Sequence, residues 1–357
     1  MRRVEPVMAR LYATDLPGVC ANCRTAESSH AFVHEPESAR IEAPMRRALA
    51  VLFATTLSLV AQDTPPATPR RAVLVTGASS GIGRKTTEVL AANGFFVWAG
   101  ARKDADLQDL AKLANVQPIR LDVTKQADID AAAKIVRDSG RGLFGLVNNA
   151  GIAVLGPMIE LRDEDLVAQL EVNVLGPFRV TKAFAPLLVE SKGRIVTTGS
   201  ISGFVTWDLG GAYTMSKHAV EAFTDTLADE LRPFGVTASV VEPGNYRSEI
   251  MKGMHQRLID GGYGGEGSLY RKPIERLKAQ SSDRSKYAEP DAVADAFLRA
   301  LNDATPQRRY MVVPDRREAE LTLRATFARV AQLNAEHPFS FDRDTLVEML
   351  DAALRAK

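Results

Sequence analysis

The sequence is poor in cysteine, in net charge and in long apolar runs. Its 357 residues contain 2 cysteines, Cys20 and Cys23, so the rest of the chain has no disulfide framework. A net charge of +1 gives no electrostatic reason to expect binding to nucleic acid or to an acidic membrane. Every apolar run is shorter than the roughly 18 residues of a membrane-spanning helix. With 45% hydrophobic and 25% charged residues, the composition is typical of a water-soluble globular protein.

Residues 1–69 are expected to form a leader that does not belong to the folded core. Cys20, Cys23, His30 and His34 are residue types that ligate zinc, but the 6 residues between the two pairs are fewer than a zinc-finger loop uses. We therefore favour a disordered tail over a metal site for this segment.

Residues 45–61 of this leader have the order of a secretory signal peptide. Met45 and two arginines precede 13 predominantly apolar residues, and a proline-rich stretch follows. Leu59 departs from the pattern, because its position before the expected cleavage site favours a small residue. Signal peptides begin proteins, so the pattern favours translation from Met45 over translation from Met1. A leader without any role in export is the alternative, and both interpretations stay open.

From residue 70 onward, short apolar runs alternate with stretches of helical periodicity. The runs are RAVLVTG, FFVWAGAR, PIRLDV, LFGLVNNAG, RIVTTGS, VTASVVEPG and RRYMVV. This alternation predicts an α/β fold over residues 70–315, with a Rossmann-type doubly wound parallel sheet in a single domain. Ligands of such a sheet are expected beyond the carboxyl ends of its strands.

Residues 316–357 are expected to form a helical C-terminal extension with two amphipathic helices. Leu323, Phe327 and Val330 form one apolar stripe. The second stripe consists of Leu346, Leu350, Ala353 and Leu354, with Asp344 as the expected N-cap. A lid or a partner-facing extension is favoured over a simple cover for the core.

A glycine-rich turn follows the first apolar run, in the segment TGASSGIG from Thr76 to Gly83. Glycines between a strand and a helix let the backbone approach a pyrophosphate, whose charge is met by the helix N-terminus. The spacing G-x-x-x-G-x-G differs from the commoner G-x-G-x-x-G fingerprint. Its position between a strand and a helix predicts a dinucleotide site.

A tyrosine, a lysine and a serine form a candidate catalytic group. Tyr213 and Lys217 are four residues apart in AYTMSKHAVEAF, and Ser200 lies upstream in TTGSISG. In a helix, positions i and i+4 share one face, so the phenol and the ammonium would point into the same space. The cation is expected to lower the tyrosine pKa from its ordinary value of about 10. With the Ser200 hydroxyl holding the substrate oxygen, this group suits the interconversion of a carbonyl and an alcohol.

Taken together, the motifs between residues 70 and 315 resemble the short-chain dehydrogenase/reductase family. The resemblance implies a catalytic tetrad of Asn173, Ser200, Tyr213 and Lys217. In this family the lysine also holds the nicotinamide ribose, and the asparagine supports a water-linked proton path. The resemblance further implies a homodimer or homotetramer.

The same resemblance assigns a set of residues to the cofactor. Asp122 in LDVT is similar to the acid that contacts the adenine ring, and the segment NNAG is similar to the one that packs on the cofactor. Ser248 replaces the usual threonine of the covering segment P-G-x-x-x-T and keeps its hydroxyl. The full set is Gly77, Ser79, Ser80, Gly81, Ile82, Gly83, Arg102, Asp122, Val123, Asn149, Ala150, Gly151, Tyr213, Lys217, Pro243, Gly244 and Ser248.

The end of the second apolar run indicates which dinucleotide is used. A carboxylate there would bond the ribose hydroxyls and repel a 2′-phosphate, but the segment reads Ala99-Gly100-Ala101-Arg102. Arg102 is placed to pair with a phosphate, with Lys103 adding charge. We therefore predict NADP(H) over NAD(H), and a solvated surface arginine is the alternative.

The stretch after Ser248 and a set of apolar residues are the features that bear on the substrate. The stretch from Ser248 to Tyr287 contains the glycine-rich segment GGYGGEG, which favours a mobile loop that closes over the site. Apolar residues expected near the site suggest a hydrophobic alcohol or ketone, although they would equally pack a lid. These residues are Met158, Phe204, Trp207, Met251 and Met254.

Other functions remain open at this stage. A sensor or scaffold that binds NADP(H) without turnover is one alternative, and an epimerase or dehydratase is a weaker one, because the C-terminal extension is short for a sugar-nucleotide domain. A cytoplasmic location is favoured, since an exported enzyme would find little NADPH. The signal-like segment leaves membrane association or export as the alternative.

Overall fold

The computed structural model describes residues 71–279 and 285–356. The cysteine pair and the signal-like segment lie outside the described residues, so the expectations for them stay predictions. Within the described ranges, every helix is too short or too polar to cross a membrane.

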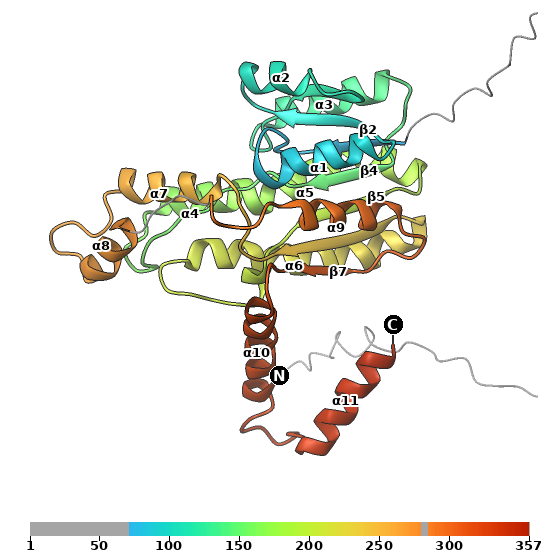
Figure 1. Cartoon of the computed structure of the whole chain (residues 1–357). Coiled ribbons are helices and arrows are strands. Elements are labelled where there is room, and N and C mark those ends of the chain that lie inside the picture. The colour runs from blue at the N-terminus through green and yellow to red at the C-terminus, as the bar shows by residue number, and fades with distance from the viewer. Residues whose placement is uncertain (1–70, 280–284, 357) are drawn as a thin grey trace, which may run out of the picture. The chain divides into compact units, whose positions relative to one another are not determined.

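Seven parallel strands form one sheet in the order β3-β2-β1-β4-β5-β6-β7 (Figure 1). The strands are β1 (Ala72–Val75), β2 (Phe96–Ala101), β3 (Val116–Arg120), β4 (Gly145–Asn148), β5 (Arg194–Thr198), β6 (Thr237–Pro243) and β7 (Arg309–Val312). Each predicted apolar run contributes one strand, and all the pairings are parallel. The predicted doubly wound parallel sheet is confirmed.

Helices cover both faces of the sheet. One face is packed by α1 (Gly81–Ala92), α2 (Asp104–Leu110) and α9 (Asp291–Asn302), and α1 and α9 lie side by side (Figure 1). The other face is packed by α3 (Gln126–Asp138), α5 (Gly176–Glu190) and α6 (Gly211–Leu231). Val73 and Val75 belong to the first core and Leu74 to the second, because successive strand residues point to opposite faces.

The strand order reverses at β1. The chain moves outward from β1 to β2 and β3, then returns to β4 on the other side of β1. Connections that leave in opposite directions open a crevice at the carboxyl ends of these two strands. This topological switch places the glycine turn after β1 beside the segment after β4.

The stretch after Ser248 is more regular than the sequence interpretation expected. It contains α7 (Ile250–Asp260) and α8 (Arg271–Ala279), and the glycine-rich segment is the connection between them. Gly262, Gly264 and Gly267 have φ values of +69°, +80° and +84°, which suit glycine. Met254, Leu258 and Ile274 bury their side chains in a small core of their own. The glycines therefore permit a tight turn between two packed helices.

The C-terminal extension consists of α10 (Arg316–Leu333) and α11 (Arg343–Arg355), as predicted. The expected N-cap of the second helix was wrong by two residues: Asp342 accepts from the Thr345 backbone N–H at 2.8 Å, and Asp344 lies inside the helix. The predicted apolar stripe of α10 is exposed to solvent, since the Phe327 side chain is 51% exposed. The apolar stripe of α10 is therefore not buried against the core.

Candidate active site

A cavity of about 590 Å³ lies at the carboxyl ends of the strands. Its walls come from the turn after β1, the ends of β2 and β5, and the segments after β3, β4 and β6. Every residue that the sequence assigned to the cofactor lines this cavity, from Gly77 to Ser248. Ser200, Tyr213 and Lys217 line it as well. Asn173 is buried beside the wall, where a Cβ on Gly151 would lie 3.5 Å from its Oδ1.

Two glycines of the first turn are required by the close approach of the backbone. Gly77 has a φ of +64°, and a Cβ there would lie 2.9 Å from the Cα of Ala150. A Cβ on Gly83 would lie 2.2 Å from the carbonyl oxygen of Gly77 and 2.3 Å from Nδ2 of Asn149. Side chains at these positions would therefore separate the turn from the segment after β4.

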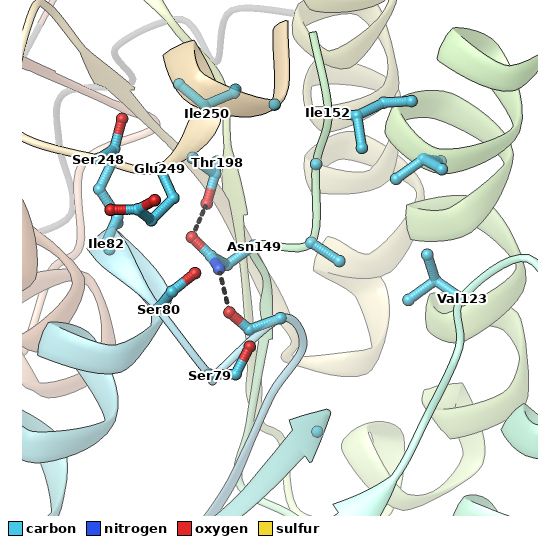
Figure 2. Close-up of a pocket in the computed structure, with 18 of the residues that line it drawn as sticks. Ser79, Ser80, Ile82, Val123, Asn149, Ile152, Thr198, Ser248, Glu249 and Ile250 are labelled. Carbon is cyan, nitrogen blue, oxygen red and sulfur yellow. Dashed lines mark hydrogen bonds between the residues drawn. The ribbon is translucent and has the colours of Figure 1, made fainter. Parts of the chain in front are cut away.

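Asn149 fastens this turn to the neighbouring strands. Its Nδ2 donates to the carbonyl oxygens of Thr76 and Gly77 at 3.0 Å and 3.1 Å. Its Oδ1 accepts from Oγ1 of Thr198, at the end of β5, at 3.3 Å. Figure 2 shows this bridge running from Thr198 through Asn149 to the turn that carries Ser79. The cavity floor is thus held by side-chain hydrogen bonds across three strand ends.

The start of α1 provides a surface that fits a pyrophosphate. Gly81, Ile82 and Gly83 begin the helix and line the cavity. The N-cap residue Ser80 has an extended backbone, and its side chain makes no capping hydrogen bond to α1, which lies wholly within the described residues. The first N–H groups of α1 and the positive end of its dipole are therefore suited to an anionic group.

Two arginines from distant parts of the chain face the same cavity. Arg102 follows β2, whose last residue is Ala101, and Arg257 comes from α7. Burial lowers the pKa of Arg257, and the like charge of Arg102 lowers it further. A bound anion would relieve this repulsion, which makes the region suitable for a phosphate. Asp104, the first acid after β2, is paired with Arg120.

Tyr213 and Lys217 share one face of α6, as their spacing predicted. Lys217 is 6% exposed, and its Nζ donates to the main-chain carbonyl oxygen of Thr198 at 2.7 Å. The same Nζ lies 5.7 Å from the centre of the Tyr213 ring. Burial lowers the pKa of Lys217 to about 8, and the negative charge of Glu221 opposes this shift.

The expectation that Lys217 lowers the pKa of Tyr213 is not met in the structure. Burial raises the pKa of Tyr213, and its hydrogen bond with Ser200 opposes the shift. Loss of water around the phenol disfavours the phenolate, and this effect outweighs the stabilising contacts. Tyr213 is therefore held as the neutral phenol, the form that donates a proton.

Asn173 lies in a π-helical segment, Glu171–Leu175, between α4 (Asp163–Leu170) and α5. Its Oδ1 accepts from the Ile152 backbone N–H at 2.9 Å. Its Nδ2 donates to the Ile152 carbonyl oxygen at 3.0 Å and to Oγ of Ser216 at 3.1 Å. Since Ser216 lies on α6, Asn173 joins the segment after β4 to the helix that carries the tyrosine. Short π-helical segments of this kind occur frequently at functional sites.

The structure adds residues that the sequence interpretation did not include. Thr198, Glu249, Arg257 and Asp106 line the cavity, and Glu249 is drawn beside Ser248 in Figure 2. Arg257 and Glu249 had no sequence signal, because they reach the cavity through the packing of α7. Thr198 ends a strand in the motif TTGS, so its position beyond a carboxyl end was a usable signal.

Four of the five apolar residues proposed for the substrate pocket form two groups, and the fifth, Phe204, is half-buried directly after the short helix Ile201–Gly203. Met254 is buried, and Met251 packs against the small core of α7 and α8. Met158 and Trp207 are exposed and pack against Gly211 and Gly210, at the start of α6. The second group therefore lies near the tyrosine helix, whereas the first stabilises the packing of α7 and α8.

The sheet topology, the glycine turn and the Tyr213–Lys217 pair define a dinucleotide-dependent oxidoreductase. A family model described as short chain dehydrogenase matches residues 71–258. The chain belongs to the short-chain dehydrogenase family.

Similar proteins support this assignment over most of the folded region. The chain is 35% identical over 253 residues to a 3-amino-tetrahydro-pyrrolizinone reductase of Xenorhabdus hominickii, covering 69% of this chain and 88% of the relative. It is 34% identical over 265 residues to mitochondrial D-beta-hydroxybutyrate dehydrogenase of Bos taurus, covering 67% and 76%. A solved short-chain dehydrogenase from Streptomyces avermitilis has a TM-score of 0.62 and 29% identity, covering 74% of this chain and 95% of that one.

These relatives are named as dehydrogenases and reductases, and solved proteins of this fold have been crystallised with NAD and with NADP. The protein is an NAD(P)-dependent oxidoreductase that acts on CH–OH groups.

Proposed function

We propose that the protein interconverts a carbonyl compound and an alcohol with NADP(H), on a hydrophobic substrate. The observation that carries this proposal is the meeting of Ser200, Tyr213 and Lys217 with the glycine turn in one cavity. A proton donor and a dinucleotide-binding surface then serve the same reacting group.

The roles of the cofactor residues follow from the family resemblance, and all of these residues line the cavity. The turn from Gly77 to Gly83 takes the pyrophosphate, and Asp122 and Val123 take the adenine end. The segment from Asn149 to Gly151 and the segment from Pro243 to Ser248 enclose the remaining length. When bound, the nicotinamide supplies or accepts the hydride.

The chain's own residues handle the proton and the substrate oxygen. Tyr213 donates a proton from its hydroxyl in the reductive direction, and Ser200 holds the substrate oxygen beside it. Lys217, fixed by Thr198, provides a positive charge that stabilises the tyrosinate left after proton transfer. Asn173 holds α6 against the segment after β4, which keeps this geometry.

The preference for NADP(H) is supported by the two arginines. Arg102 and Arg257 repel one another across the cavity, and a 2′-phosphate would pair with both. Ala101 at the end of β2 offers no carboxylate to compete for the ribose. Asp106 on α2 also lines the cavity, and its negative charge would act against a phosphate.

A hydrophobic substrate is supported by Met158 and Trp207, which are exposed beside the start of the tyrosine helix. The pyrrolizinone reductase and the hydroxybutyrate dehydrogenase are named for chemically different substrates, so their names do not select one. We infer a carbonyl or alcohol attached to an apolar group.

The protein is also proposed to act as a homodimer or homotetramer in the cytoplasm. Val167, Leu175 and Phe178 leave an exposed apolar surface on α4, the π-helical segment and α5, which suits contact with a second copy. A cytoplasmic location agrees with the use of NADPH.

A panel of apolar ketones, aldehydes and alcohols, assayed with both cofactors by nicotinamide absorbance, tests the proposed function. We expect turnover of at least one apolar ketone or alcohol, with NADPH or NADP preferred. Tight cofactor binding without turnover across the panel would instead favour a sensor or scaffold.

A further inference from the structure

Glu221 lies one helical turn beyond Lys217 on the same face of α6. Tyr213, Lys217 and Glu221 occupy positions i, i+4 and i+8, so the carboxyl group continues the row formed by the catalytic pair. Glu221 is 7% exposed. Burying an ionised carboxylate costs free energy unless an opposite charge compensates it. The burial of Glu221 therefore indicates a specific role.

Glu221 also packs against the loop that carries Ser200. A Cβ on Gly199 would lie 3.0 Å from Oε1 of Glu221, and a Cβ on Gly203 would lie 2.8 Å from it. The two glycines flank Ser200 on either side. The carboxyl group therefore packs against the loop that carries Ser200 and lies one helical turn from Lys217 in the sequence of α6.

A second acid lies directly behind the first. Glu242, on β6, is 3% exposed, and Arg309 on β7 places its Nε 3.2 Å from Oε2 of Glu221 and 3.5 Å from Oε1 of Glu242. Neither Oε1 of Glu221 nor Oε1 of Glu242 has a hydrogen-bond donor elsewhere among the described residues. With both carboxyls ionised, these two oxygen atoms would therefore stay unpaired. A single proton on Glu242, donated to Glu221, gives the pair the hydrogen bond that joins them.

The charges around the pair decide where this proton resides. Glu221 faces Lys217 and Asp225 on its own helix, Glu242 on β6 and Arg309 on β7. Arg309 is shared with Asp225, which it contacts at 2.6 Å. Glu242 is the deeper of the two acids, at 3% exposed against 7% for Glu221. Burial, and then the charge of Glu221, raise its pKa to about 8. Burial raises the pKa of Glu221 as well, but the charge of Arg309 and the hydrogen bond with Glu242 oppose that shift, so we assign the proton to Glu242 and the negative charge to Glu221.

We propose that Glu221 is a positioning residue for the catalytic group: it supplies the buried negative charge that keeps Lys217 protonated, and it braces the loop of Ser200. Glu242 and Arg309 hold this charge in place. The inference rests on the proposed function, because it concerns the lysine that serves the tyrosine and the cofactor. Under this proposal, Glu221 helps to set the pH range over which the enzyme is active.

The test replaces Glu221 by glutamine, which removes the charge and keeps the shape. Without the negative charge of Glu221, Lys217 is expected to lose its proton at lower pH. The pH at which kcat/KM falls on the alkaline side is therefore expected to decrease by about one unit. The pH dependence of NADPH affinity, measured by cofactor fluorescence without turnover, is expected to move in the same direction.

Asp225→Asn is the matched control, because it removes one negative charge and one Arg309 contact a further turn along the helix. We expect it to move the alkaline limb much less than Glu221→Gln does. Glu221→Asp, which keeps the charge, is expected to restore most of the wild-type profile. Equal shifts in Glu221→Gln and Asp225→Asn, or an unchanged profile in Glu221→Gln, would overturn the proposal.

A measurement on the wild-type protein covers the case in which Glu221→Gln does not fold. A buried counter-charge is screened weakly by salt, so the alkaline limb of NADPH binding is expected to move little between low and high ionic strength. A shift of about a full unit would contradict a buried partner for Lys217. Absence of NADPH binding at every pH would instead contradict the proposed function, which keeps the two failures distinguishable.

Discussion

Lys217 donates a hydrogen bond from Nζ to the main-chain carbonyl oxygen of Thr198 at 2.7 Å. Because Thr198 also donates from Oγ1 to Asn149, this contact joins the tyrosine helix to the strand end that supports the glycine turn. The proton-transfer group and the dinucleotide surface are therefore parts of one hydrogen-bonded framework. Substitutions in the dinucleotide surface are expected to change cofactor affinity. Substitutions in the proton-transfer group are expected to change turnover.

Gly83→Ala is expected to impair cofactor binding. The new Cβ would lie 2.2 Å from the Gly77 carbonyl oxygen, so the turn must move away from the segment after β4. Overpacking of this kind costs about 1–3 kcal/mol of stability, and the displaced turn would no longer present its backbone to a pyrophosphate. Titration of NADPH by fluorescence, with thermal melting alongside, measures both effects. Gly265→Ala, where a Cβ meets an ordinary contact at 3.5 Å, is the control, and equal losses in both variants would contradict this explanation.

Arg102→Ala and Arg257→Ala are each expected to weaken NADPH binding more than NADH binding. Losing one charge-assisted hydrogen bond to a phosphate costs about 1.5–3 kcal/mol, or roughly tenfold to a hundredfold in Kd. The effect on NADH is expected to be small, because that cofactor lacks the 2′-phosphate. Arg137→Ala on the exposed side of α3 provides a matched control. Equal losses for both cofactors would remove these arginines from phosphate selection.

Glu242→Gln is expected to change how stability depends on pH. Burial and the neighbouring Glu221 raise the pKa of Glu242 from 4.5 to about 8 in the folded chain. Between these values the folded chain keeps a proton that the unfolded chain has released, so the contribution of this group falls as pH rises from about 4.5 to about 8. Glutamine carries no charge at either pH, so the variant is expected to melt a few degrees above the wild type near pH 8. The difference in melting temperature between the variant and the wild type is expected to vanish near pH 5, roughly one half-unit above the ordinary carboxyl pKa. A difference in melting temperature that is the same at both pH values would contradict the assignment.

Glu318→Ala is expected to weaken cofactor binding from a site outside the sheet. Glu318, on α10, accepts from the Asn245 backbone N–H at 2.9 Å and from its Nδ2 at 2.7 Å. Asn245 directly follows Gly244, which lines the cavity, so these contacts hold the covering segment. Their loss is expected to raise the NADPH Kd about threefold to tenfold. Glu320→Ala, which removes an exposed acid on the same helix, is the control, and a matching effect there would point to a general change in α10.

The sequence identified the parts of the site that depend on local spacing. The strand-to-helix glycine turn and the Tyr213–Lys217 interval are short-range patterns, and the structure places both at one cavity. The direction of the Tyr213 pKa shift was missed, because spacing reveals a nearby cation but not the desolvation that outweighs it.

Other features depend on packing between distant segments. Arg257 reaches the cavity because α7 folds over it, and the glycine-rich composition after Ser248 suggested a loop there. Glu221 and Glu242 are 21 positions apart in the sequence, and they meet because α6 packs on β6. Such pairs become apparent only once the register of the sheet and the rotation of the helix are known.

Tyr213→Phe tests the central proposal most directly, with NADPH consumption and NADPH binding measured on the same full-length preparation. Removing the hydroxyl removes the proton donor, so turnover of an accepted ketone is expected to fall by about 10²–10⁴-fold. NADPH affinity is expected to change little, because the glycine turn and the arginines remain. Tyr270→Phe, which removes a tyrosine hydroxyl just before α8, serves as the control and is expected to stay active. Retention of wild-type turnover in Tyr213→Phe would contradict the proposed chemistry.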